Sequence, residues 1–149
     1  MDKDIEYMKE AYKEALKALK IDEVPIGVVI VKDDQIIGRG YNRKETSKLA
    51  TRHAEMIAIE DAETFLGNWH LDDCVMYSTL EPCLMCTGAI VHSRIKRVVY
   101  GASEKRFSSF SHLVECEKLN HYPELTKDVM KDECSTLISD YFRNKRKNK

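Results

Sequence analysis

Two short fragments of the sequence hold residue types that can do metal chemistry. They are His53-Ala54-Glu55 and Pro82-Cys83-Leu84-Met85-Cys86. One imidazole and two thiols give three protein ligands, and a tetrahedral zinc ion with three protein ligands keeps its fourth position open for water. That pattern is typical of catalytic zinc sites, whereas structural sites use four protein ligands. We therefore predict that His53, Cys83 and Cys86 bind a catalytic zinc ion.

The spacing within each fragment sets conditions on the local structure. Cys83 and Cys86 are three residues apart, so they can lie on one face of a helix and reach the same ion. His53 and Glu55 are two apart and would point about 200° away from each other in the middle of a regular helix. They can share a site at a first turn, where the entering chain is not yet helical. We therefore expect both ligand groups at helix N-termini, whose partial positive charge favours a thiolate over a thiol.

Glu55 stands beside a predicted ligand and is the candidate for moving protons. Zinc lowers the pKa of its bound water from about 15.7 to roughly 7, which provides hydroxide near neutral pH. A neighbouring carboxylate can accept the proton of that water, deliver it to a ring nitrogen of a substrate and later protonate departing ammonia. These are the steps of a hydrolytic deamination.

The composition limits the kind of protein that carries these fragments. The chain has 149 residues, of which 43% are hydrophobic, and this is enough for one domain over residues 1–149 with a single core. The sequence has no run of about 18 apolar residues and no signal-peptide stretch, so we expect a soluble cytoplasmic protein without membrane contact. Five cysteines, two of them in a C-x-x-C pair, argue against a disulfide framework.

The charge is unevenly distributed along the chain. Residues 143–149 hold five bases and no acid, which leaves 19 bases against 25 acids, or −6, for the rest. An acidic body cannot hold a long duplex through phosphate contacts alone, so any nucleic-acid contact is expected to be small and local, aided by the basic end. A solvated helix end explains these bases equally well.

Hydrophobic patterns predict the elements that must position the candidate residues. They indicate a helix over 2–19, a strand pair over 27–31 and 35–41, a helix over about 52–65 with Thr51 as N-cap, a strand over 74–80, a helix from Pro82 to about His92, a strand over 97–100 and a last helix over about 127–146. A helix follows a strand twice, which predicts a mixed sheet with parallel neighbours and helices packed against it. The signals weaken beyond Gly101.

The two fragments together are more specific than either alone. A single C-x-x-C is also compatible with a thioredoxin-like redox pair or with chance. H-x-E followed by P-C-x-x-C is the known signature of zinc-dependent nucleobase deaminases. Around these motifs, residues 23–42, 51–59, 78–101 and 132–142 resemble the tRNA-specific adenosine deaminases of the cytidine-deaminase superfamily. The resemblance covers most of the chain.

The resemblance implies an α/β fold, a three-layer α/β/α sandwich with a five-stranded mixed sheet, and a homodimer with one zinc per subunit. It implies conversion of adenosine to inosine at the wobble position of a tRNA anticodon. It also implies that His53, Cys83 and Cys86 bind zinc and that Glu55 is the proton shuttle. By matching position, the nucleoside-contacting residues are Asn42, Ile26, Ala54, Leu80 and Glu81, and the residues near flanking nucleotides are Tyr141, Phe142 and Arg143.

Several side chains also have a simpler structural explanation. Tyr141 and Phe142 fit the buried stripe of the last helix as well as they fit an RNA contact. That predicted stripe consists of Val129, Met130, Cys134, Leu137, Ile138, Tyr141 and Phe142. Cys74, Cys116 and Cys134 are expected to be small buried hydrophobes, and Trp69 is expected to be a packing anchor.

Two differences from the bacterial members leave alternatives open. Residues 103–110 contain no glycine where those members have a glycine-rich loop, and the region down to Asn120 is shorter. A free nucleobase or nucleoside such as guanine or cytosine is therefore the alternative substrate. Arg52 replaces a residue that is usually small, and TRHAEM is similar to the catalytic subunit of the eukaryotic heterodimeric tRNA deaminase, so a heteromer is the alternative assembly. A third alternative is a non-catalytic zinc-binding module, although such a module has no use for Glu55.

Overall fold

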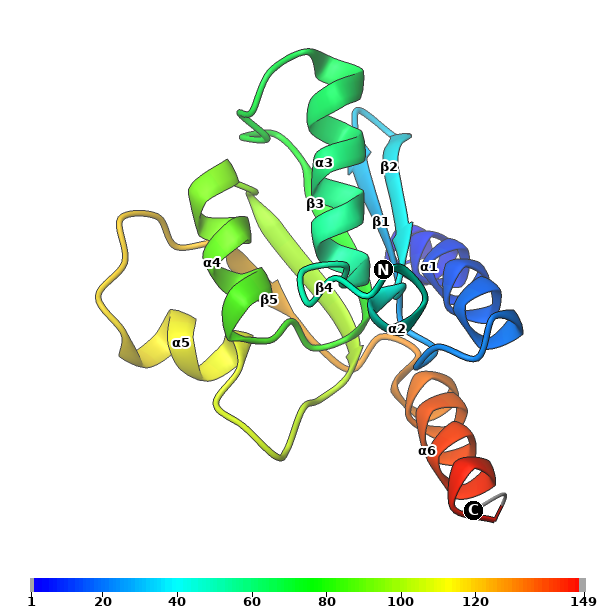
Figure 1. Cartoon of the computed structure of the whole chain (residues 1–149). Helices are drawn as coiled ribbons and strands as arrows, with labels where there is room; N and C mark the ends of the chain where they lie inside the picture. The colour runs from blue at the N-terminus through cyan, green and yellow to red at the C-terminus, as the bar shows by residue number, and fades with distance from the viewer. Residues whose placement is uncertain (1, 148–149) are drawn as a thin grey trace.

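A computed structural model describes residues 2–147, and helices cover both faces of a central sheet (Figure 1). Met1 and residues 148–149, which include the last base of the basic end, lie outside the described residues. The elements are α1 (Asp2–Lys20), β1 (Gly27–Lys32), β2 (Gln35–Tyr41), α2 (Lys44–Ser47), α3 (Ala54–Leu66), β3 (Val75–Leu80), α4 (Leu84–Ser93), β4 (Arg97–Ala102), α5 (Phe110–Cys116), β5 (Glu124–Thr126) and α6 (Lys131–Lys147). Among the described helices, none is both long enough and apolar enough to span a membrane.

The sheet is mixed and has five strands in the order β2-β1-β3-β4-β5. β1 runs antiparallel to β2 and to β3, whereas β4 runs parallel to β3 and to β5. The two strand-helix successions predicted from the sequence correspond to β2-α3-β3 and β3-α4-β4. The second of them joins two parallel neighbours, β3 and β4. The expected five-stranded mixed sheet flanked by helices is confirmed.

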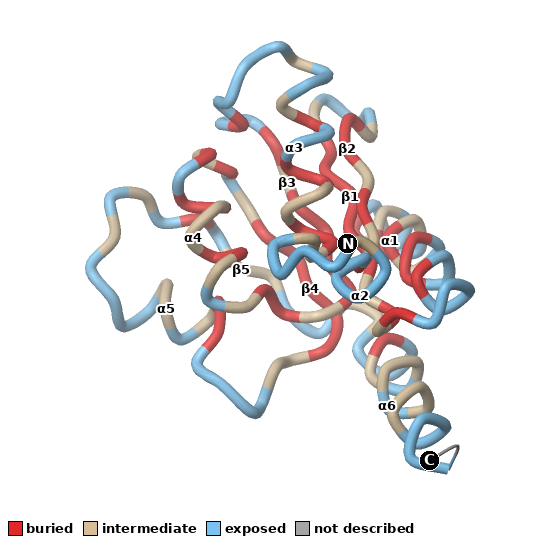
Figure 2. The backbone as a smooth tube through the Cα atoms, in the orientation of Figure 1, coloured by how far each residue is buried: buried red, intermediate tan, exposed pale blue. Residues whose placement is uncertain are grey.

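The hydrophobic core has two parts, one on each face of the sheet. Val28 and Ile30 of β1 pack with residues of α3 and α4, whereas Val29 and Val31 pack with residues of α1 and α6. Successive strand residues point to opposite faces, and both faces of β1 are covered. This explains why the GVVIV run is apolar throughout, and Figure 2 shows the buried backbone concentrated at the centre of the sheet.

A glycine in β2 lets α3 approach the sheet closely. A Cβ atom added at Gly40 would collide with the carbonyl oxygen of Ala54, the first residue of α3. Gly27 does the same on the opposite face, where an added Cβ would collide with the carbonyl oxygen of Ala11 in α1. Because His53 directly precedes α3, the contact at Gly40 determines where the first candidate zinc ligand enters the site.

The C-terminal third differs most from the sequence prediction. The patterns predict neither α5 nor β5. α6 begins at Lys131 and not near Lys127, because Asp128 and Met130 adopt positive φ angles of 66° and 56°, which a right-handed helix excludes. Of the predicted stripe of α6 only Cys134 is buried, since this helix covers the sheet mainly through its first turns.

Two predictions about single side chains are wrong. Cys116 is exposed, because it ends the short helix α5 at the surface. Trp69 is 53% exposed and stacks on His70, with ring centroids 3.7 Å apart, in the connection between α3 and β3. Trp69 therefore packs on its neighbour and not in the core.

A largely buried ion pair anchors α1 to the sheet. The Asp4 carboxylate accepts a hydrogen bond from Arg97 Nη2 at 2.8 Å and another from the Tyr77 hydroxyl at 2.8 Å. Arg97 also donates to Thr126 Oγ1 at 3.0 Å, so one guanidinium connects α1, β4 and β5. The Arg97 guanidinium holds the pKa of Asp4 below its ordinary value.

Replacing Asp4 with Asn is expected to reduce the free energy of unfolding by about 1–3 kcal/mol at neutral pH, because a charged hydrogen-bond acceptor is lost. The native pKa of Asp4 is lowered, so its contribution is fully present above the unfolded value of about 3.9. It is lost as the pH falls through the native pKa. Urea unfolding of wild type and Asp4→Asn across pH 3–8 should show their free energies of unfolding converging at low pH. A constant difference at every pH would contradict this account.

Candidate active site

The three candidate zinc ligands lie together, although they come from two separate segments. His53 Nδ1 lies 3.6 Å from Cys83 Sγ and 3.6 Å from Cys86 Sγ, and the three atoms all lie within 4.8 Å of one another. In a tetrahedral site with Zn–N of about 2.0–2.1 Å and Zn–S of about 2.3 Å, nitrogen and sulfur ligands are about 3.6 Å apart. The three side chains therefore fit a zinc ion.

The start of α3 positions His53 and Glu55 on the same side. The helix begins at Ala54, and His53 is its N-cap in an extended conformation with φ −74° and ψ 152°. The predicted N-cap, Thr51, is therefore wrong, because the extended backbone at His53 prevents the helix from starting earlier. This break in the helical backbone allows two residues at i and i+2 to line one cleft.

The start of α4 positions the two cysteines. Cys83 is the N-cap, with φ −75° and ψ −178°, and Cys86 is the third residue of the helix. Pro82 thus precedes the helix and does not open it as predicted. Its carbonyl oxygen accepts a hydrogen bond from the Phe110 N–H at 3.1 Å, which ties it to α5. Both sulfurs lie at the positive end of a helix, as their spacing predicts.

The two thiols differ in acidity because they share a hydrogen bond. The bond from Cys86 lowers the pKa of Cys83 to about 4, so Cys83 is a thiolate at neutral pH. The same bond and burial raise the pKa of Cys86. The bond to Cys83 raises the pKa of His53. Since a coordinating thiol is deprotonated outright, this donor set can exchange its protons for a divalent metal ion.

Glu55 lines a cleft of about 300 Å³ together with His53 and Cys83. Glu55 is only 4% exposed. Burial raises the pKa of its carboxyl group to about 7. A carboxyl group with a pKa near neutrality can both accept and donate a proton under physiological conditions.

The residues that the resemblance links to the nucleoside line this same cleft. They are Asn42, Ile26, Ala54, Leu80 and Glu81. Asn42 and Ile26 flank the β1–β2 hairpin and are joined by a hydrogen bond from Asn42 N–H to the Ile26 carbonyl oxygen at 3.1 Å. Asn42 Nδ2 also lies 3.4 Å from the Val24 carbonyl oxygen. The hairpin base therefore forms one wall of the cleft.

The carboxylate of Glu81 is engaged with the protein itself. It accepts the Glu104 N–H at 3.1 Å, the Ser111 N–H at 2.8 Å and the Ser111 hydroxyl at 2.7 Å. Glu81 is 4% exposed. Its side chain thus holds both ends of the segment between β4 and α5, a role that the sequence does not reveal.

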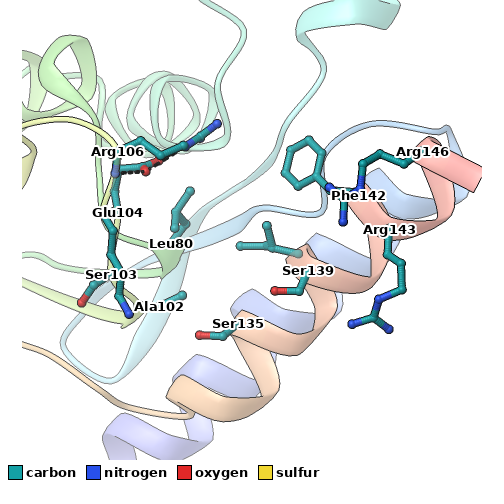
Figure 3. A pocket seen from close by; sticks show the side chains of 12 residues that line it. Leu80, Ala102, Ser103, Glu104, Arg106, Ser135, Ser139, Phe142, Arg143 and Arg146 are labelled. Carbon is teal, nitrogen blue, oxygen red and sulfur yellow. Dashed lines mark hydrogen bonds and ion pairs between the residues drawn. The ribbon is translucent and has the colours of Figure 1, made fainter.

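The three residues linked to flanking nucleotides have different surroundings. Phe142 lines the cleft beside Glu55, and Phe142 and Arg143 line a neighbouring cleft of about 600 Å³ (Figure 3). Tyr141 lines neither cleft, because its hydroxyl donates to the Asp22 carbonyl oxygen at 3.0 Å and ties α6 to the turn after α1. Tyr141 and Phe142 are both half-buried, so neither is a full core residue.

Several cleft residues were missed by the sequence reasoning. They are Val24, Lys44, Glu104, Arg106, Phe107 and Ile138. Three of them lie in the glycine-free segment 103–110, where an aromatic residue follows two bases. That composition was the available signal, since bases next to an aromatic side chain are typical of nucleic-acid contacts.

Comparisons with known proteins agree with this geometry. Residues 1–102 match the family model of the cytidine and deoxycytidylate deaminase zinc-binding region. The chain is 44% identical over 146 residues to a tRNA-specific adenosine deaminase of Streptococcus pyogenes. The match covers 96% of this chain and 92% of the relative.

Solved structures show the same fold. One comes from a study of A-to-I editing by tRNA:A34 deaminases at the wobble position and has a TM-score of 0.84 and 35% sequence identity to this chain. The match covers 89% of this chain and 98% of the chain in that structure. A guanine deaminase from Bacillus subtilis has a TM-score of 0.62 and 43% identity and covers 65% of this chain and 62% of its own.

Replacing Cys86 with Ser is expected to weaken zinc binding by more than about 100-fold, because even indirect partners of zinc ligands contribute about 10–100-fold. The exposed Cys116 offers a matched control, and its replacement with Ser should leave the zinc content unchanged. Competition with a chromophoric chelator measures both affinities. Wild-type affinity in the Cys86→Ser variant would rule out this ligand set.

Proposed function

We infer the reaction from the family, because the chain belongs to the tRNA-specific adenosine deaminases within the cytidine and deoxycytidylate deaminase zinc-binding family. We propose that it hydrolyses adenosine to inosine and ammonia at the wobble position of a tRNA anticodon. The observation that carries this proposal is 44% identity over 96% of the chain, combined with the close approach of His53, Cys83 and Cys86.

One zinc ion per subunit belongs to the proposal, with His53, Cys83 and Cys86 as its ligands. When bound, zinc would supply the Lewis acidity that activates water for attack on adenine C6. Glu55 moves the protons. Its carboxylate accepts a proton from the attacking water, passes it to a purine ring nitrogen and returns a proton to the amine that leaves as ammonia.

The cleft walls orient the nucleoside over Glu55. We assign the side-chain amide of Asn42 to a hydrogen bond with the nucleoside and the apolar side chain of Ile26 to packing on the base. The backbone near Ala54 and at Leu80 and Glu81 completes the pocket. All of these residues line the cleft of about 300 Å³ that contains Glu55, which supports the assignment.

The neighbouring cleft supports RNA as the substrate. It adjoins the first one, since Leu80, Arg106 and Phe142 line both. Its basic residues are Lys105, Arg106, Arg143 and Arg146, and the acidic residue among its lining is Glu104 (Figure 3). On a chain whose first 142 residues carry a net charge of −6, such a cluster suits a short contact with the phosphates of a single-stranded loop.

A free nucleobase is the second candidate substrate. The similarity to the guanine deaminase of Bacillus subtilis favours it, although that similarity covers only 65% of this chain. The basic cleft argues for RNA, because a free base carries no phosphate for it to bind.

We also propose that the chain forms a homodimer. The observation in favour is the outward face of α4, where Leu84 is 67% exposed beside a groove of about 390 Å³ shared with α5. Val91 and Leu113 are among the apolar residues that line this groove. A heteromer is the alternative assembly, and a cytoplasmic location stays a prediction.

Incubation of the zinc-loaded protein with an anticodon stem-loop that bears adenosine at the wobble position should yield inosine, read by nucleoside mass spectrometry. A stem-loop with adenosine only elsewhere in the loop serves as the control substrate. Ammonia release from free guanine, cytosine, adenine and their nucleosides should be negligible. Turnover of a free base without conversion of the stem-loop would replace the proposal with the alternative.

Replacing Glu55 with Gln is expected to lower kcat by at least about 100-fold, since general acid–base catalysis contributes about 10²–10⁴-fold. The zinc ligands are untouched, so native mass spectrometry should find one zinc per subunit in a dimer for variant and wild type alike. Full activity of the variant would refute the proton shuttle. A monomer, or a dimer with one zinc in total, would refute the proposed assembly.

A further inference from the structure

Phe107 is an exposed aromatic residue on the wall of the active-site cleft. It is 66% exposed, whereas Glu55 in the same cleft is 4% exposed. Phe107 is therefore the solvent-accessible side chain of the two, whereas the Glu55 carboxylate is enclosed by the protein. An apolar ring at this position gains little from the fold of its own chain, and its large exposed area is free to contact a ligand that enters the cleft.

Arg106 lies over the Phe107 ring, and Glu104 in turn holds Arg106. The guanidinium of Arg106 lies 5.1 Å from the centroid of the Phe107 ring. Arg106 is held in turn by the Glu104 carboxylate, through hydrogen bonds of 3.0 Å from Nε and 3.1 Å from Nη2. A cation over an aromatic face restricts the ring and adds a positive charge beside it. This is a suitable environment for a nucleobase joined to a phosphate.

Glu81 fixes the segment that carries this pair. Its buried carboxylate binds the N–H groups of Glu104 and Ser111, which lie on either side of Arg106 and Phe107. Loss of one of these bonds would leave a buried polar group without a partner, which is costly. The segment is thus held at both ends and presents its exposed aromatic tip to the cleft.

We propose that Phe107 is a stacking platform for the nucleobase next to the target adenosine and that Glu81 is the positioning residue that holds it there. The proposal rests on the proposed function and adds a specificity contact to it. Bases stack on aromatic side chains because every base has a flat π-face, and removal of such a side chain weakens binding by about 5- to 150-fold per base. A free base has no neighbour to stack, so Phe107 would favour RNA over it.

The test compares Phe107→Ala with wild type on an anticodon stem-loop and on stem-loops made abasic at each nucleotide flanking the target. We expect Phe107→Ala to raise KM by about 5- to 150-fold with kcat nearly unchanged. Phe107→Trp should recover most of the affinity. At one flanking position the abasic RNA should abolish the difference between wild type and Phe107→Ala, which identifies the stacked base.

Phe65 provides the matched control, because it is 60% exposed at the far end of α3 and lines no part of this cleft. Phe65→Ala should leave KM unchanged. Glu81→Gln keeps one carbonyl acceptor but places an amide against backbone N–H donors. Glu81→Gln should raise KM as Phe107→Ala does. The variant that carries both substitutions should have a KM little higher than that of either single variant.

The outcomes separate this inference from the proposed function. Conversion of the stem-loop by wild type with an unchanged KM for Phe107→Ala would overturn the inference alone. The inference would also be overturned if Phe107→Ala raised KM by the same factor on every abasic stem-loop as on the intact one. If wild type converts no stem-loop, the proposed function fails and the inference fails with it.

Discussion

The structure depends on the meeting of two helix N-termini at one point. The first brings His53 and Glu55 and the second brings Cys83 and Cys86, and both enter the site through an extended N-cap residue. Close contact at Gly40 places α3 against the sheet, and α4 follows directly after β3. The site brings three ionisable groups close together, those of Cys83, Cys86 and Glu55. Their desolvation is costly, and a divalent cation offsets that cost.

Buried carboxylates serve different purposes around this point. Glu23 is 1% exposed and accepts the N–H groups of Glu45 and Thr46 at 3.2 and 2.6 Å, which holds α2 on one side of the cleft. Glu81 holds the segment before α5 on the other side. Glu55 faces the cleft between them. Two acids therefore fix the walls, and the third is available for proton transfer.

The parts of the fold that follow from local chemistry could be predicted from the sequence. The C-x-x-C spacing and the H-x-E pair were sufficient to expect three ligands and a carboxylate at helix N-termini, and the apolar GVVIV run indicated the first strand of a hairpin. The start of α1 was predicted correctly, whereas the starts of α3, α4 and α6 were misplaced, because they depend on the backbone conformation of single residues, such as the extended His53. β5 was missed because it has only three residues and lies at the edge of the sheet, next to β4.

Long-range contacts explain the rest of what the sequence could not reveal. Nothing near Glu81 in the chain indicates that it binds Ser111, and nothing near Tyr141 indicates that it binds the turn at Asp22.

X-ray absorption at the zinc edge tests the central claim most directly, because it reads the ligand set itself. The account predicts two sulfur ligands at about 2.3 Å and two lighter ligands at about 2.0–2.1 Å, one from His53 and one from solvent. A shell of four sulfurs, or one without sulfur, would contradict it.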